Sequence, residues 1–399
     1  MTRITFLIAL LAAFPPLSTD MYLLAIPQLQ AEWNQPLVMV NLTLICFFLT
    51  YCLFMLIYGP VSDRFGRRPP LLVGIVIYII GSLMCAFAVN LSTLIAARIV
   101  QASGAASASV LSLAISKDLF DTRKREQIMA YIAIIMAFAP MCAPVIGGWI
   151  IHYCSWRLVF VLQAAMGAAA WMGVYRMAEP LHNFQVLSAT TALTVYLRLF
   201  RNRRFAGLML ALSILPFPLF GFIAGVPEIY MTRFGMDERQ FGYFFGFNAI
   251  ASLIGAFSFT RLSRRFSSAS LMTTSFIGIF AAGCLLLLLP HQSPWSLAFP
   301  MWVLTLFLGL NRPPSNNLML EQVERDVGAA SALIVFTFMT VGALSMAIIS
   351  LPWEDKITVL GVMATIVATL TLTFWLRFKD RFFRRGQGEA EPQSAIGAR

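Results

Sequence analysis

Two oppositely charged residues, Asp20 and Arg98, lie inside long apolar stretches of this sequence, where a carboxylate and a guanidinium could control a proton. A charged side chain at the centre of a membrane-spanning helix costs about 2.5–3.5 kcal/mol, so residues of this kind are candidates for function. A helical rise of about 1.5 Å per residue places Asp20 about 9 Å and Arg98 about 8 Å from the outer ends of their apolar stretches. At this matched depth the two charges can offset each other's burial cost.

Two interpretations of this pair stay open. In the first, the two residues form a structural ion pair that holds two helices together. In the second, Asp20 is a protonatable carboxylate whose affinity for a proton depends on whether Arg98 is next to it. Coupling to a proton gradient requires a group of the second kind, so Asp20 and Arg98 are the candidate proton-coupling residues.

Two further charged residues interrupt apolar segments of the second half of the chain. Arg312, in the stretch NRPPSNN, lies about 24 Å from the outer end of its segment and therefore in the inner half of the membrane. It could line a cavity or extend its side chain to the interface. Glu228, in GVPEIY, is expected at the outer interface, with a cavity position as the alternative.

The elements that must position these residues are apolar segments of about 20 residues, the length of a helix that crosses the hydrocarbon of a bilayer. Of the 399 residues, 59% are hydrophobic and only 12% are charged, which excludes an ordinary soluble domain. The first segment continues beyond Pro15 and Pro16, so we expect a retained span and not a cleaved signal peptide. The sequence predicts an all-α membrane protein with twelve spans, at 4–26, 37–59, 70–89, 93–115, 127–151, 157–178, 204–229, 241–260, 269–290, 297–320, 328–351 and 357–378.

The positive charges predict how these spans are oriented. With the N-terminus inside, 23 of the 29 Lys and Arg residues fall in inner segments and 4 in outer loops, while Arg98 and Arg312 lie within spans. Because basic loops stay in the cytoplasm, both termini are expected there, in a bacterial inner (plasma) membrane. The net charge of +11 is spread over short loops, which argues against a nucleic-acid partner. We expect a monomer in the lipid bilayer.

The longest internal break, Glu179 to Arg203, divides the chain into two halves of six spans. We expect an N-terminal six-helix bundle at 1–178, a cytoplasmic central loop at 179–203, a C-terminal six-helix bundle at 204–378 and a cytoplasmic tail at 379–399. SDRF at 62–65 recurs as SRRF at 263–266, each after the second span of its half, which indicates pseudo-symmetry. The stretch Ala189–Phe200 predicts an amphipathic helix along the inner membrane surface.

Missing patterns exclude several kinds of chemistry. No Gly-Lys dipeptide occurs, so a GxxxxGK[ST] phosphate-binding loop is absent. The six cysteines lack CxxC spacing, and the three histidines form no HExxH arrangement. We therefore expect neither an enzyme nor a metal or other cofactor.

Four short motifs carry a family resemblance. They are GPVSDRFGRRPP from Gly59, RIVQASGAA from Arg98, APMCAPVIGG from Ala139 and STDMYLLAIP from Ser18. The first three resemble the loop 2–3 signature, the span 4 pattern and the antiporter motif of the major facilitator superfamily, although alanines at 139 and 143 replace two glycines of the antiporter motif. The fourth is similar to the first-span motif of the Bcr/CflA-type (bicyclomycin/chloramphenicol resistance) subfamily, in the drug:proton antiporter branch.

This resemblance implies the major facilitator fold, with two six-helix bundles around a central cavity. It implies that Asp63 of loop 2–3 contacts the positive N-terminal end of span 11, near Gly328, in the outward-facing state, an attraction of up to about 1 kcal/mol. Breaking this contact would let the halves open inward. The conformational latch would comprise Gly59, Asp63, Arg64, Gly66, Arg67 and Arg68. In the antiporter motif, Pro144, Gly147 and Gly148 would let span 5 bend and pack closely.

The candidate cavity residues are polar, aromatic or flexible side chains near the predicted spans that would line the cavity, since such pockets accept amphipathic small molecules. They are Tyr22, Asn41, Gln101, Tyr131, Met136, Phe138, Asn248 and Arg312. Each could instead pack in the protein interior or face lipid.

The resemblance predicts a proton-coupled secondary transporter that exports drugs or similar small amphipathic molecules and is driven by the proton gradient. Export of an endogenous metabolite, such as an amino acid or a nucleoside, by the same mechanism is the alternative. A membrane sensor or scaffold would need a sizeable soluble domain, which is not expected from the 22 residues after Arg377.

Overall fold

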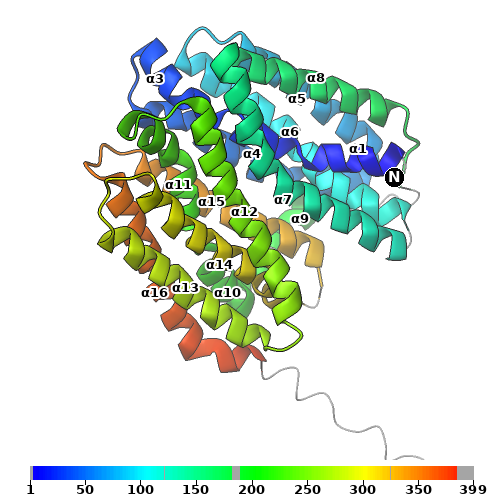
Figure 1. Cartoon of the computed structure of the whole chain (residues 1–399). Helices are drawn as coiled ribbons and strands as arrows, with labels where there is room; N and C mark the ends of the chain where they lie inside the picture. Colours follow the sequence, from blue (N-terminus) through cyan, green and yellow to red (C-terminus); the bar gives the residue numbers. More distant parts are fainter. Residues whose placement is uncertain (1–2, 121, 182–188, 324, 384–399) are drawn as a thin grey trace, which may run out of the picture.

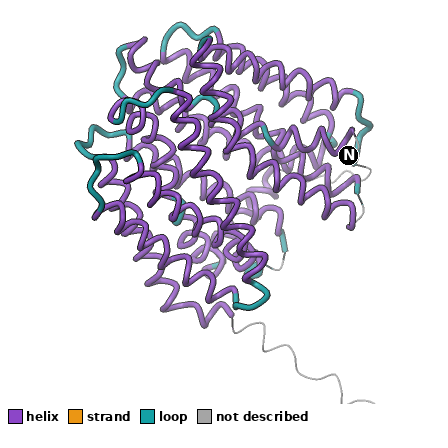
Figure 2. The backbone as a smooth tube through the Cα atoms, in the orientation of Figure 1, coloured by secondary structure: helices purple, strands orange, loops and turns teal. Residues whose placement is uncertain are grey.

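The computed structural model describes the backbone of residues 3–120, 122–181, 189–323 and 325–383, and the side chains of all of these except 3, 122–127, 129–137, 189–193 and 380–383. Within these ranges the chain forms helices joined by loops and turns, and no β-strand is present (Figure 2). This confirms the all-α class that the sequence predicts.

The first helical group ends at Tyr175. Its elements are α1 (Arg3–Ala12), α2 (Phe14–Asp20), the short helix η1 (Leu23–Ala25), α3 (Ile26–Trp33), α4 (Leu37–Phe65), α5 (Arg68–Ala86), α6 (Leu91–Leu119), α7 (Thr122–Tyr153) and α8 (Trp156–Tyr175). Polar residues mark where helices begin: Asn90 and Thr93 form a capping box at α6, and Ser155 caps α8.

The second helical group follows the central segment, which contains α9 (Ala189–Arg201) where an amphipathic helix was predicted. The elements of the second group are α10 (Arg203–Ser213), α11 (Phe217–Pro227), η2 (Glu228–Arg233), α12 (Glu238–Leu262), α13 (Ser268–Leu288), α14 (Trp295–Leu320), α15 (Val327–Ile349) and α16 (Lys356–Phe383).

Prolines interrupt the first membrane segment of each group. Pro15 and Pro16 begin α2, and Pro216 lies between α10 and α11. A proline lacks an amide donor and clashes with the preceding turn, so it ends or bends a helix. Carbonyl groups near both breaks accept hydrogen bonds from other helices, at Ser18 in the first group and at Phe217 in the second.

Ten helical segments of the described residues are long and apolar enough to cross a membrane, so the chain is a multi-pass membrane protein. They coincide with ten of the twelve expected spans. The other two expected spans, 127–151 and 297–320, are helical as α7 and α14. The sequence NRPPSNN makes the C-terminal half of α14 too polar for the same apolar criterion.

The two helical groups lie side by side and meet along two pairs of helices. Helix α4 packs against α15, and α7 packs against α12, near the middle of Figure 1. Helices α5, α6 and α8 belong to one side of the molecule in this view, and α13, α14 and α16 to the other. Helix α9 packs against α10 and α15. This arrangement places polar residues of both groups near their shared interface.

Candidate functional site

Arg98 on α6 is fully buried in the first helical group. Its Nη1 donates hydrogen bonds to the carbonyl oxygen of Ser18 at 2.9 Å and to Oε1 of Gln101 at 2.6 Å. Its guanidinium carbon lies 4.2–5.7 Å from the centres of three aromatic rings, those of Phe47, Tyr22 and Phe160. Charge-assisted hydrogen bonds and cation–π contacts stabilise a buried guanidinium. Helix α6 therefore holds a positive charge against the broken first span.

Asp20 is buried at the end of α2, but it does not form the expected ion pair with Arg98. Its carboxylate accepts a hydrogen bond from Thr19 Oγ1 at 2.9 Å. No basic nitrogen of a described residue lies within 4 Å of it, because Arg98 binds the carbonyl of Ser18, two residues earlier, and Gln101 instead. The structural ion pair, one of the two interpretations that the sequence leaves open, is therefore not formed in this conformation, although α2 and α6 do contact each other.

Gln101 continues the polar network inside the first group. Its Nε2 donates to Ser82 Oγ at 2.8 Å and to Gln163 Oε1 at 2.7 Å, and Gln163 donates in turn to the carbonyl of Leu17. Gln101 and Tyr22 are both fully buried, and the Tyr22 hydroxyl is hydrogen-bonded to Thr43. The structure therefore places these two predicted cavity residues in the interior of the group, because their polar atoms are already satisfied there.

Asn41 on α4 joins the two helical groups near the ends that the sequence predicts to be outer. Its Nδ2 donates to the carbonyl oxygen of Ala224 on α11 at 3.1 Å and to Ser350 Oγ, just after α15, at 2.7 Å. Nearby, Gln28 Nε2 donates to Glu238 Oε1 at 3.0 Å. Asn41 is fully buried, so it is an interface residue and not the cavity-lining residue that was predicted.

The antiporter motif on α7 lies at a second close contact with other helices. A Cβ atom at Gly147 would lie 2.4 Å from the carbonyl oxygen of Met21, and one at Gly148 would lie 2.6 Å from that of Glu238. A Cβ atom at Gly242 on α12 would lie 3.1 Å from the carbonyl oxygen of Pro144, a less severe contact. Small residues at these positions let the backbones approach, as the resemblance implied.

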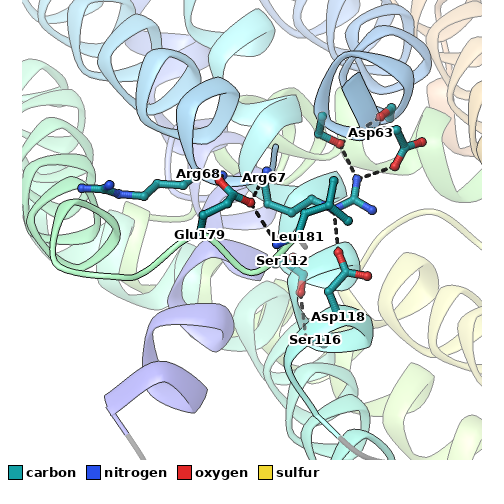
Figure 3. A network of polar contacts seen from close by, with 10 residues as sticks. Asp63, Arg67, Arg68, Ser112, Ser116, Asp118, Glu179 and Leu181 are labelled. Carbon is teal, nitrogen blue, oxygen red and sulfur yellow. Dashed lines mark hydrogen bonds and ion pairs between the residues drawn. The ribbon is translucent and has the colours of Figure 1, made fainter. Parts of the chain in front are cut away.

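Arg67 is the centre of a polar network in loop 2–3 (Figure 3). Its Nε donates to Asp118 Oδ2 at 2.7 Å, and its Nη1 donates to Asp63 Oδ1 at 2.6 Å and to Ser62 Oγ at 2.7 Å. Asp63 is therefore bound within its own loop. At the start of α15, Gly328 is exposed and a Cβ added there would meet no atom within 4 Å. The predicted Asp63–α15 contact is thus open in this conformation, while the outer ends are joined through Asn41.

Glu179, after α8, anchors the same loop from the other side (Figure 3). Its two carboxylate oxygens accept hydrogen bonds from the backbone amides of Arg67 and Arg68, at 2.7 and 3.0 Å. Gly66 has φ +88°, and a Cβ there would lie 2.8 Å from Glu179 Oε2, so only glycine fits this turn. Arg68 lies over the ring of Tyr175.

Neither Glu179 nor Asp118 was identified from the sequence. Both are acidic residues close to the predicted inner ends of spans, among basic residues whose charges they could neutralise, and this was the available signal. Of the other latch residues, Arg64 is exposed beside Phe65, and Gly59 has open space around it.

Glu228 lies in an ion pair at the predicted outer end of the second group and does not line the cavity described below. Its partner is Lys356 at the start of α16. The adjacent Asp355 accepts hydrogen bonds from Thr358, Arg233 and His291. Partial burial raises the pKa of Asp355, but these hydrogen bonds outweigh it and bring the pKa down to about 2. The outer loops of the second group are thus tied together by charge.

A cavity of about 210 Å³ lies in the second group, between α10, α11, α14 and α15. Arg312 lines it from α14, with its guanidinium carbon 5.4 Å from the centre of the Phe338 ring on α15. The structure thus favours the cavity over the interface for Arg312. Further lining residues include Ser213, Leu219, Thr305, Asn311, Ser315 and Ile334.

The remaining predicted cavity residues have three different outcomes. Asn248 is buried behind the cavity, where its Oδ1 accepts from the lining residue Thr305 at 2.9 Å. Phe138 is exposed on α7. The side chains of Tyr131 and Met136 lie outside the described residues.

The protein crosses the membrane several times, its two helical groups are joined at one end, and a partly polar cavity lies beside their interface. This is the architecture of a membrane transporter. The chain belongs to the Major Facilitator Superfamily, whose family model matches residues 8–346. This confirms the resemblance seen in the four motifs, and it makes the protein a transporter and not an enzyme.

The chain is similar to curated proteins along almost its whole length. It is 28% identical to the uncharacterized MFS-type transporter YdgK of Bacillus subtilis, over 95% of this chain and 96% of that protein. It is 26% identical to the bicyclomycin resistance protein homolog of Haemophilus influenzae, over 95% and 97%. It is 27% identical to multidrug resistance protein D of Escherichia coli, over 96% and 97%.

A solved structure has the same fold. The crystal structure of a D-xylose-proton symporter matches with a TM-score of 0.75, covering 92% of this chain and 96% of its own, at 16% sequence identity. At this identity the likeness shows the fold alone. It supports the arrangement of helices described above.

Proposed function

We propose that this protein is a proton-coupled exporter of drugs or similar small amphipathic molecules in a bacterial inner membrane. In this proposal the chain crosses the membrane twelve times with both termini in the cytoplasm. The names of its relatives, bicyclomycin resistance protein homolog and multidrug resistance protein D, favour drugs over an endogenous metabolite.

The observation that carries the proposal is the unequal closure of the two helical groups. Asn41 joins them at the ends that the charge distribution predicts to be outside, while Asp63 is held within its own loop and the start of α15 is exposed at the opposite ends. An alternating-access transporter requires a conformation with one end closed and the other open. The structure described here would be the inward-facing member of that pair.

Residues 1–178 and 204–378 would rock against each other as two units, linked by 179–203 and followed by the tail 379–399. Closing the inner ends would bring Asp63 to the N-terminal end of α15, where a carboxylate is stabilised by about 0.3–1 kcal/mol. Arg67 would have to release Asp63, although it would keep Asp118 as a partner. The latch is therefore an exchange of partners for Asp63.

Asp20 would carry the proton. It is buried in the first group, no described residue is its basic partner, and Arg98 holds the carbonyl of Ser18 two residues away. A rotation of the Arg98 side chain, or a change in the break of the first span, would change the distance between guanidinium and carboxylate. The affinity of Asp20 for a proton would then differ between the two conformations, which is what coupling requires.

The test of this proposal is proton-driven transport in everted membrane vesicles with bicyclomycin and a panel of other drugs. Wild-type protein is expected to release protons from the vesicles when a substrate is added. The Asp20→Asn variant is expected to lose this signal. Glu32→Gln is the matched control, because Glu32 is a carboxylate near the end of α3 that is ion-paired with Arg157.

Proton movement that persists at the wild-type level in Asp20→Asn would remove Asp20 from the mechanism. Wild-type protein that moves no compound of the panel under an imposed gradient would contradict drug export as a whole.

A further inference from the structure

The cavity of the second helical group has an unusual charge balance. Of the described residues that line it, only Arg312 carries a formal charge, and no aspartate or glutamate is present. The rest of the lining consists of aliphatic, aromatic and neutral polar side chains. The cavity therefore has a net positive charge in the inner half of the membrane, where an uncompensated charge is costly.

Arg312 differs from Arg98 and Arg67, two other arginines of the membrane segments and their ends. Arg98 makes hydrogen bonds to Ser18 and Gln101, and Arg67 is paired with two aspartates. Arg312 is an exposed residue whose guanidinium lies over the Phe338 ring. No hydrogen bond or ion pair joins it to any described residue. Its five N–H donors are thus available to a bound molecule.

Three other polar groups of this cavity also have no partner among the described residues: two hydroxyls, which can donate, and one amide oxygen, which accepts. Ser213 Oγ, Asn311 Oδ1 and Ser315 Oγ line the cavity, belong to residues that are only 3–4% exposed, and have no hydrogen-bond partner among the described residues. Buried polar groups without partners are rare in folded proteins and need a reason. Ser315 lies three residues after Arg312, so both side chains project from the same face of α14.

We propose that this cavity binds a monoanionic amphipathic cargo, with its carboxylate on Arg312 and its apolar or aromatic body against Phe338 and the aliphatic lining. Serine hydroxyls at 213 and 315 can donate to the same anion. A planar guanidinium binds a carboxylate with two parallel hydrogen bonds, and its positive charge repels cationic compounds. This inference rests on the proposed function and names the class of cargo.

The test uses three probes that share one ring system: 2-naphthoate, 2-naphthamide and the 2-naphthylmethylammonium cation. Binding to the purified full-length protein is measured by isothermal titration calorimetry in detergent. Wild-type protein is expected to prefer naphthoate to the amide and to bind the cation most weakly. In Arg312→Gln, naphthoate affinity is expected to fall about tenfold and the order of preference to disappear, because a charge-assisted hydrogen bond is lost.

Arg261→Gln is the matched control, since Arg261 is an exposed arginine at the end of α12 and does not line the cavity. It is expected to bind all three probes as wild type does. Arg312→Lys keeps the charge and is expected to retain the preference for naphthoate over the cation. It supplies the comparison should Arg312→Gln prove unstable.

Equal binding of the three probes by wild-type protein, a preference for the cation, or failure to bind naphthoate would each overturn the inference. So would naphthoate affinity that is unchanged in Arg312→Gln. Transport separates this inference from the proposed function. If proteoliposomes export naphthamide or the cation under a proton gradient but not naphthoate, the export proposal is supported and the anion site is contradicted. If naphthoate binds through Arg312 but no probe or drug is transported, the anion site is supported and the export proposal is contradicted.

Discussion

Asn41 provides a direct test of how the two helical groups are held together at the ends that the proposed orientation makes outer. Its Nδ2 donates to Ala224 and Ser350, which both belong to the second group. Asn41→Ala removes both hydrogen bonds without altering the interior of either group. Each bond contributes about 0.5–1.5 kcal/mol, so the loss is about 1–3 kcal/mol. Because these bonds exist only while the outer ends are closed, their loss shifts the conformational equilibrium toward the outer-open state.

A loss of this size changes the ratio of outer-closed to outer-open molecules by about 5- to 150-fold. The population is measured by double electron–electron resonance between spin labels at two exposed outer positions, Ala31→Cys on α3 and Gln292→Cys after α13. The six native cysteines are unpaired, so they can be replaced by serine without breaking a disulfide. We expect the distance distribution to gain a longer component in Asn41→Ala.

The control for this experiment is Asn90→Ala, which removes another asparagine on the outer side. Asn90 caps α6 within the first group and makes no hydrogen bond to the second. It is expected to leave the inter-group distance unchanged. An Asn41→Ala distribution identical to that of wild type, or a shift of equal size in Asn90→Ala, would refute the role of Asn41 as the outer closure.

Two other predictions concern stability. Glu179→Gln is expected to lower the free energy of unfolding by about 1 kcal/mol, because it weakens a charged cap on the first amides of α5. Thermal unfolding in detergent measures this change, and the exposed Glu321→Gln is the control that should show none. An unaltered melting temperature in Glu179→Gln would contradict the capping role. Asp355 has a pKa of about 2, below its unfolded value of 3.8, so its stabilising effect is complete above about pH 4 and is lost as the pH falls toward 2. Asp355→Asn should therefore be less stable than wild type at pH 7, and its stability should fall less as the pH is lowered toward 2. Thermal unfolding of both proteins as a function of pH measures this, and equal stability profiles would show that Asp355 contributes nothing.

The membrane class and the positions of the helices could be predicted from the sequence because the cause is local. A segment of about 20 apolar residues is stable in lipid as a helix whatever its neighbours are, since its backbone groups bond within the segment. The expected span at 37–59 is thus found inside α4, and the span at 357–378 inside α16. The motif around Asp63 was also visible, because its residues are adjacent in the chain.

The partners of the polar residues could not be predicted in the same way. Arg98 was expected to pair with Asp20 from their similar depth, but depth does not determine which atom a side chain reaches. The break at Pro15 and Pro16 leaves the carbonyl of Ser18 available, and Arg98 binds it. Asn41 was expected in a cavity and lies in the interface between the groups instead, because α4 packs against α15.

What the sequence determined by itself is which segments enter the membrane and which residue types they carry. Only the tertiary structure decided that Glu179 meets the amides of Arg67 and Arg68, 111–112 positions away in the chain. It also decided that Arg312 faces a cavity and has no hydrogen-bond or ion-pair partner among the described residues. The physical reason is that lipid selects a helix by its average hydrophobicity. Contacts between helices depend instead on how each helix is rotated, tilted and broken, and those quantities are set by all the helices together.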